Sequence, residues 1–194
     1  MRLVLVSENA NKARELGDAL PGWTVERWQG PPLPPETGET FRDNARGKAL
    51  HGRAEGDPEA WMAGEDSGLE VAALGGAPGI FSARYAGEDA TDDQNVEKLL
   101  AALQGVEERR ARYVCELVAL GPEGAEIAVN GTLEGSIADA ARAGEGFGYD
   151  PVFVPDGETQ TVAELGNAWK SSHSHRARAA RALAVALGVD APDR

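Results

Sequence analysis

Short apolar runs alternate with amphipathic stretches over the first third of the chain, and this order restricts the fold more than any other feature. Residues 2–7 are apolar and β-branched, which is typical of a strand buried on both faces. A helical apolar stripe follows and ends at Pro21-Gly22, and residues 24–28 again favour a strand. The pattern predicts strands that lie beside one another with helices packed on the sheet.

Later segments extend this pattern. We expect a helix from Thr40 to about Glu55, a short strand at Trp61–Ala63 and a helix over 91–104. Two antiparallel strands, 112–120 and 127–137, are expected around a Gly-Pro-Glu-Gly turn, and a last helix is expected after Ser174. The predicted fold is α/β with a mixed sheet, in one domain covering residues 1–194, and the final few residues should be disordered.

Charge and composition exclude several classes of protein. The net charge of −13 argues against a surface that coats nucleic acid, which needs a basic face. No stretch is long enough to span a bilayer, and the apolar N-terminal run is too short for a signal-peptide core, so a cytoplasmic location is expected. The single cysteine, Cys115, excludes an internal disulfide and fits a packed strand residue better than a reactive thiol.

Ser7, Asn9 and Lys12 form the first candidate motif, between a strand and a helix. Loops at the carboxyl ends of strands often bind ligands in α/β sheets, and the amides at a helix start suit phosphate. Lys12 would add a positive charge there. The alternative is an asparagine-rich turn with a solvated lysine.

Glu36, Asn44 and Lys48 form the second motif, and Glu65-Asp66-Ser67-Gly68 forms the third at an expected strand end. Carboxylates beside an amide and a lysine suit Mg²⁺, which takes one or two carboxylates and completes its shell with water and phosphates. Such a carboxylate could also orient or deprotonate an attacking water. The alternatives are a helix cap at Thr40 with a surface lysine and a polar turn around Asp66.

Two further motifs lie in the last third of the chain. In Gly146-Phe147-Gly148-Tyr149-Asp150-Pro151, the glycines allow close approach to a flat ring, Phe147 could stack on a base, and Asp150 could accept from a ring N–H. Lys170-Ser171-x-x-Ser174-His175-Arg176 concentrates donors at the expected start of the last helix. The alternatives are an aromatic loop packed on the core and a basic helix start paired with surface acids.

The five motifs together resemble the ITP/XTP pyrophosphatases, which hydrolyse purine nucleoside triphosphates carrying non-standard bases. The similarity is closest over Gly64–Leu69 and Leu74–Gly87, in Phe147–Pro151, and in Ser174-His175-Arg176, and it runs from about residue 3 to residue 187. Glu8 and Glu65 depart from the commonest pattern of the family, which often has glycine and aspartate there.

The resemblance implies an elongated mixed sheet flanked by helices, two lobes with a cleft between them, a homodimer and a requirement for Mg²⁺. It implies that Glu36 and Asp66 hold the metal and that Asp66 also activates water. The residues that would bind substrate are Ser7, Asn9, Lys12, Lys48, Ser67, Phe147, Gly148, Tyr149, Asp150, Lys170, His175 and Arg176.

The resulting hypothesis is hydrolysis of dITP, ITP or XTP to a nucleoside monophosphate and pyrophosphate. The alternative is a regulatory module that binds a nucleotide without turnover, which would not need Glu36 and Asp66 together. A phosphatase acting on phosphomonoesters would release orthophosphate instead. A Nudix-type hydrolase is disfavoured because no helix carries the clustered glutamates of that motif.

Overall fold

The computed structural model describes residues 1–20 and 22–188, so the expectations for Pro21 and for the final residues lie outside them. The strands are β1 (Arg2–Leu5), β2 (Thr24–Arg27), β3 (Trp61–Val71), β4 (Arg110–Leu120), β5 (Glu126–Ile137) and β6 (Phe153–Pro155). The helices are α1 (Ala10–Ala19), α2 (Phe41–Glu55), α3 (Asp92–Ala102), α4 (Val162–His173) and α5 (His175–Ala186), with short 3₁₀ helices η1 (Ala72–Leu74) and η2 (Gly79–Arg84).

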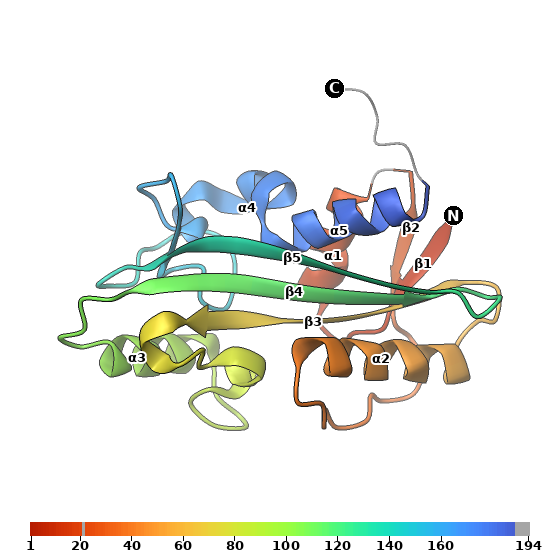
Figure 1. The fold of residues 1–194 in the computed structure, drawn as a ribbon, viewed down its shortest axis with the longest axis horizontal. Helices are drawn as coiled ribbons and strands as arrows, with labels where there is room; N and C mark the ends of the chain where they lie inside the picture. Colours follow the sequence, from red (N-terminus) through yellow and green to blue (C-terminus); the bar gives the residue numbers. More distant parts are fainter. Residues whose placement is uncertain (21, 189–194) are drawn as a thin grey trace. The chain divides into compact units, whose positions relative to one another are not determined.

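The strands form one sheet in the order β2-β1-β3-β4-β5-β6, with helices packed on it (Figure 1). β1 runs parallel to both β2 and β3, whereas β5 and β6 are antiparallel. The predicted α/β class with a mixed sheet is therefore confirmed. Within the described residues, every helix is too short or too polar to cross a membrane.

The chain divides into two compact units, which are described separately. Unit 1 contains residues 1–66, 115–131 and the chain from His175 onward, and unit 2 contains residues 67–114 and 132–174. Each unit has its own buried apolar cluster. Leu3, Leu5, Leu16, Leu117 and Leu183 belong to the main cluster of unit 1. Leu69, Leu99, Leu133, Tyr149 and Phe153 belong to that of unit 2.

β1 is buried on both faces, as its composition predicts. Leu3 and Leu5 pack into the cluster shared with α1 and α5, while Val4 and Val6 pack with Trp28 and Met62 on the other face. In unit 1, α2 lies on one side of the sheet and α1 and α5 lie on the other (Figure 1). Side chains that alternate along a unit 1 strand therefore meet different helices.

The predicted helix after Thr40 is confirmed as α2. The Thr40 hydroxyl accepts a hydrogen bond from the Asp43 amide and caps the helix, and Phe41, Ala45 and Ala49 are buried. The helix backbone approaches β3 closely at Gly64, where a Cβ atom would lie 1.9 Å from the Ala45 carbonyl oxygen. This contact brings the polar face of α2 next to the acids that follow Gly64.

Three sequence expectations are corrected. β3 extends to Val71 rather than ending near Ala63, so Glu65-Asp66-Ser67-Gly68 lies inside a strand and not in a polar turn. The helix α4 was not anticipated, because Gly166 adopts a non-helical φ of 79° and interrupts its pattern. Lys170 lies near the C-terminal end of α4, and Ser174 ends that helix just before α5 begins.

Candidate active site

Asp66 is the centre of a polar cluster on the α2 side of unit 1. Its side chain leaves β3 beside Asn44 and Lys48, which lie one turn apart on α2. The Asn44 side-chain amide donates to Asp66 Oδ2 at 3.0 Å, and Lys48 Nζ lies 3.5 Å from Asp66 Oδ1. Lys48 Nζ also lies 2.5 Å from Glu36 Oε1. Two acids thirty positions apart therefore share one lysine.

The loop that carries Glu36 is tied to the same cluster by Asn44. The Gly38 amide donates to Asn44 Oδ1 at 2.8 Å, so the two ends of the Asn44 side chain connect the loop with Asp66. A Cβ atom at Gly38 would lie 2.6 Å from that oxygen, which explains the need for glycine there. The sequence placed Asn44 in the second candidate motif, beside Lys48 on one helix face, but did not indicate that it joins this loop to Asp66.

Burial and neighbouring charges have opposite effects on the pKa of Asp66 and on that of Lys48. Burial raises the Asp66 pKa above its ordinary value, and the positive charges of Lys48 and Lys12 only partly offset the effect. Burial lowers the Lys48 pKa, but the carboxylates of Asp66 and Glu36 outweigh it, so the pKa lies above its usual value. A carboxylate with a raised pKa is a stronger base, which suits Asp66 to accept a proton.

The donor set fits a magnesium ion bound together with phosphates. Glu36 and Asp66 lie close enough to the same Lys48 nitrogen to approach a common cation. Among the described residues, no group of three or more His, Cys, Asp or Glu side chains is arranged to hold a metal. Two carboxylates are what Mg²⁺ takes from a protein when phosphates and waters supply its remaining ligands.

Side chains of the loop between β1 and α1 hydrogen-bond to the backbone of the loop and of the helix start. Ser7 Oγ accepts from the Asn9 amide at 3.2 Å, and Asn9 Oδ1 accepts from the amides of Asn11 and Lys12. Asn9 therefore caps α1 and satisfies two of the amides that the sequence suggested would be unpaired. Lys12, in the first turn of α1, is the cation next to this loop.

A second group of charges lies on the other side of β3 in unit 1. Glu65 Oε2 is 2.9 Å from Lys12 Nζ, and Glu65 Oε1 accepts from Arg176 Nη2 at 3.2 Å. Arg176 Nη1 also donates to Glu15. Burial lowers the Arg176 pKa, but Glu65 and Glu15 outweigh it and keep the guanidinium charged. His175, next to Arg176, is buried too.

Unit 2 contains a separate cluster around Asp150. Its Oδ2 accepts from Lys170 Nζ at 2.7 Å and from the Phe147 amide at 3.0 Å, while Oδ1 accepts from the Tyr113 hydroxyl at 3.2 Å. Lys170 Nζ lies 4.5 Å from the centre of the Phe147 ring, in cation–π contact. The predicted aromatic-glycine motif and Lys170 thus come together on one buried carboxylate.

The remaining residues of the fourth motif have structural partners. The Gly148 amide donates to Asp92 Oδ2 at 2.7 Å, and Gly148 has a φ of 63° that favours glycine. The Tyr149 ring is buried in the unit 2 cluster, and its hydroxyl donates to the Ser82 carbonyl at 2.9 Å. Ser67 follows Asp66 in β3 and is half-buried.

The candidate residues thus fall into two sets. Unit 2 brings together Phe147, Asp150 and Lys170 and also holds Gly148, Tyr149 and Ser67. Unit 1 holds the others, with Glu36, Lys48 and Asp66 together on one side of β3 and Lys12 and Arg176 joined by Glu65 on the other, and it also contains Ser7, Asn9 and His175. Sequence reasoning missed Glu15 and Tyr113. Tyr113 lies within an apolar strand and Glu15 within an amphipathic helix, so their local sequence gave no signal.

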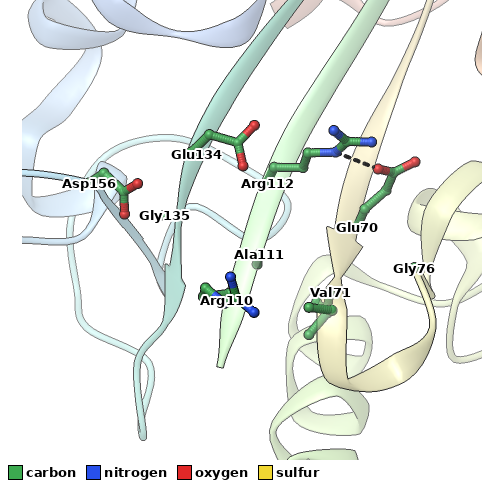
Figure 2. Close-up of a pocket in the computed structure, with 10 residues that line it drawn as sticks. Glu70, Val71, Gly76, Arg110, Ala111, Arg112, Glu134, Gly135 and Asp156 are labelled. Carbon is green, nitrogen blue, oxygen red and sulfur yellow. Dashed lines mark hydrogen bonds and ion pairs between the residues drawn. The ribbon is translucent and has the colours of Figure 1, made fainter. Parts of the chain in front are cut away.

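A hollow of about 300 Å³ lies elsewhere in unit 2, over the ends of β3, β4 and β5 (Figure 2). Arg112 reaches across it and donates to Glu70 at 2.7 Å. Arg110, Glu134 and Asp156 also line it. None of the predicted site residues belongs to this hollow, and its exposed, mixed charges are typical of a solvated sheet face.

The fold is that of an α/β protein, and unit 1 carries buried and half-buried acids paired with cations, with Glu36 and Asp66 at Lys48 and Glu65 between Lys12 and Arg176. A sequence model of the Ham1 family matches residues 3–186, so the chain belongs to the Ham1 family. The family expected from the five motifs is therefore confirmed.

Curated relatives carry the same name across distant bacteria. The chain is 51% identical over 151 residues to the dITP/XTP pyrophosphatase of Bdellovibrio bacteriovorus, covering 77% of this chain and 75% of that protein. It is 43% identical to the dITP/XTP pyrophosphatase of Thermus thermophilus, covering 100% and 95%. Among solved structures, the Ham1 protein of Staphylococcus aureus is 36% identical with a TM-score of 0.83, covering 97% and 98%.

Proposed function

We propose that this protein hydrolyses non-standard purine nucleoside triphosphates, such as dITP, ITP and XTP, to a nucleoside monophosphate and pyrophosphate. Its membership of the Ham1 family and the names of its relatives support this assignment. The single structural observation that carries it is the convergence of Glu36 and Asp66 on Lys48, because a module that only binds a nucleotide does not need two acids there.

In the proposed reaction, the oxygen of a water molecule attacks the α-phosphorus. The bond between the α-phosphorus and the oxygen that bridges the α- and β-phosphates breaks, and this oxygen leaves with the pyrophosphate. Asp66 takes the proton of the attacking water, for which its burial and raised pKa suit it. Glu36 and Asp66 would hold Mg²⁺, which would offset phosphate charge when bound. Lys12 and Lys48 neutralise the departing pyrophosphate, so positioning and charge stabilisation account for most of the rate.

Ser7, Asn9 and Lys12 are proposed to bind the triphosphate, and Ser67 to contact the substrate. The residues proposed to enclose the base and sugar are Phe147, Gly148, Tyr149, Asp150, Lys170, His175 and Arg176. Phe147 would stack on the base, and Asp150, Lys170, His175 and Arg176 would supply polar contacts. A 6-oxo purine offers an acceptor at O6 and a donor at N1, while adenine offers the reverse. A pocket built for the first pattern leaves buried groups unpaired with adenine, and such mismatches discriminate by on the order of 10⁴-fold.

The whole chain is proposed to work as one domain of two lobes, as a homodimer in the cytoplasm. A monomer has a mass of 20.4 kDa, so light scattering that returns twice this value would support the dimer. A return of the monomer mass at micromolar concentrations would contradict it.

The decisive experiment is a panel of nucleoside triphosphates incubated with Mg²⁺ and assayed separately for pyrophosphate and orthophosphate. We expect pyrophosphate from dITP, ITP and XTP, little product from ATP, and loss of activity with EDTA. Orthophosphate as the first product would favour a phosphatase. Tight binding of ITP without any product would favour the nucleotide-binding module.

A further inference from the structure

The adjacent acids Glu65 and Asp66 serve different parts of unit 1. Neighbouring side chains in a strand point to opposite faces, and β3 follows this rule here. Asp66 faces Asn44 and Lys48 of α2, whereas Glu65 faces Lys12 of α1 and Arg176 of α5. Only one member of the pair can therefore belong to the metal-binding cluster described above.

The two oxygens of Glu65 hold two different cations. Oε2 lies 2.9 Å from Lys12 Nζ, and Oε1 accepts from Arg176 Nη2 at 3.2 Å. The Glu65 side chain is 1% exposed and that of Arg176 is 3% exposed, while that of Lys12 is 15% exposed. The contacts therefore run from a fully buried arginine to a lysine that reaches the surface.

Arg176 anchors this arrangement from its other side. Its Nη1 donates to the buried Glu15 of α1, so the guanidinium lies between two carboxylates. The backbone also restricts α5, since a Cβ atom at Gly131 of β5 would lie 2.2 Å from the His175 carbonyl oxygen. With Arg176 fixed in this way, Glu65 Oε1 is held and Oε2 presents a defined position to Lys12.

We propose that Glu65 is a positioning residue, which holds the Lys12 ammonium in place to receive the pyrophosphate part of the substrate. The inference rests on the proposed function, because Lys12 is assigned there to the phosphates. Glu65 itself contacts neither the metal nor the reacting phosphorus. Its role is to restrict a flexible lysine, whose side chain would otherwise lose rotamer freedom on binding.

A purely electrostatic role for Glu65 predicts the opposite effect on binding. A carboxylate near the phosphates repels them, so its neutralisation would tighten the binding of pyrophosphate. A positioning role predicts weaker binding, because Lys12 loses its fixed location. The direction of the change in pyrophosphate affinity therefore separates the two.

The test uses the full-length Glu65→Gln variant and calorimetric titration with pyrophosphate in the presence of Mg²⁺. We expect the dissociation constant to rise on the order of tenfold, with Glu65→Asp restoring binding to within about threefold of the wild type. The matched control is Glu26→Gln, which removes the same charge from an exposed pair with Arg2 in unit 1 and should leave affinity unchanged. Unchanged or tighter binding by Glu65→Gln overturns the proposal.

A double-mutant cycle checks that Glu65 acts through Lys12. In the Lys12→Met background, Glu65→Gln should change pyrophosphate affinity less than twofold, and a full effect there overturns the proposal. If Glu65→Gln does not fold, ¹⁵N relaxation of the Lys12 ammonium in the wild type decides, with Lys12→Met for assignment. A restrained ammonium supports the proposal and a freely rotating one overturns it. A wild type that binds pyrophosphate yet produces none from ITP contradicts the proposed function, whatever the Glu65 result.

Discussion

Asp66 is the residue on which the proposed chemistry depends most directly. Asparagine has nearly the same shape and cannot accept the proton of an attacking water. We expect Asp66→Asn to keep the fold and to lower kcat by roughly 10²- to 10⁴-fold, the range for removal of a general base. Steady-state release of pyrophosphate from ITP measures the effect, with circular dichroism to check folding. Turnover close to that of the wild type would remove Asp66 from the role of base.

Tyr113 supports the other cluster through a single hydroxyl. Its hydroxyl donates to Asp150 Oδ1 at 3.2 Å, and its ring packs 4.6 Å from that of Phe153. Tyr113→Phe keeps the ring and removes a buried hydrogen bond to a carboxylate, so we expect a loss of about 1–2 kcal/mol in the free energy of unfolding. Urea denaturation measures the loss.

Tyr85→Phe is the control for this change. The Tyr85 ring lies 4.5 Å from Lys98 Nζ, while its hydroxyl has no hydrogen bond among the described residues. The control should lie within about 0.5 kcal/mol of the wild type, because the substitution keeps the half-buried ring and removes a hydroxyl without a hydrogen bond among the described residues. Equal effects of the two substitutions would show that the contact with Asp150 contributes nothing.

At the level of elements, the packing of α2 on β3 brings Asp66 to Lys48. The closest approach is at Gly64, where an added Cβ atom would lie 1.9 Å from the Ala45 carbonyl oxygen and 2.6 Å from the Ala49 amide nitrogen. Both atoms belong to the helix backbone and cannot rotate away. We expect Gly64→Ala to cost at least about 2–3 kcal/mol of stability, with loss of activity as α2 moves.

Gly47 offers the matched control on the same helix. It is exposed within α2, and a Cβ atom there would meet nothing within 4 Å. Gly47→Ala should stabilise the protein by about 0.5–1 kcal/mol through helix propensity. Thermal and urea unfolding of both variants test the pair. A Gly64→Ala protein as stable as the wild type would mean that α2 does not pack as described.

At the level of the whole molecule, the net charge of the protein affects the binding of small anions and of polyanions differently. The chain carries a net charge of −13, yet unit 1 places Lys48 beside Asp66 and, on the other side of β3, Lys12 and Arg176 beside Glu65. A local cluster with a metal can bind a triphosphate, whereas a long polyanion meets the repulsion of the whole surface. We therefore expect that the protein does not shift duplex DNA in gel electrophoresis. The salt concentration should be about 50–100 mM, which is on the order of the ionic strength in cells. Micromolar retention of DNA would contradict this expectation.

Local sequence patterns were sufficient to predict most of the helices and strands. The β-branched composition of residues 2–7 predicted a strand buried on both faces, the spacing of Phe41, Ala45 and Ala49 predicted the buried face of α2, and Thr91 predicted a helix start. Each of these signals is confined to one element, because periodicity and capping depend on neighbours within a few residues. The length of β3 and the presence of α4 were missed because polar residues and Gly166 interrupt those signals.

The residue types of the site could also be read from the sequence, but their pairing could not. Nothing in the order Glu65-Asp66 indicates that one acid meets Lys48 and the other meets Lys12 and Arg176. That division follows from which helix covers each face of β3. Contacts between residues more than a hundred positions apart, such as Arg176 with Glu65, arise only when the elements pack, since burial then forces each charge to find a partner.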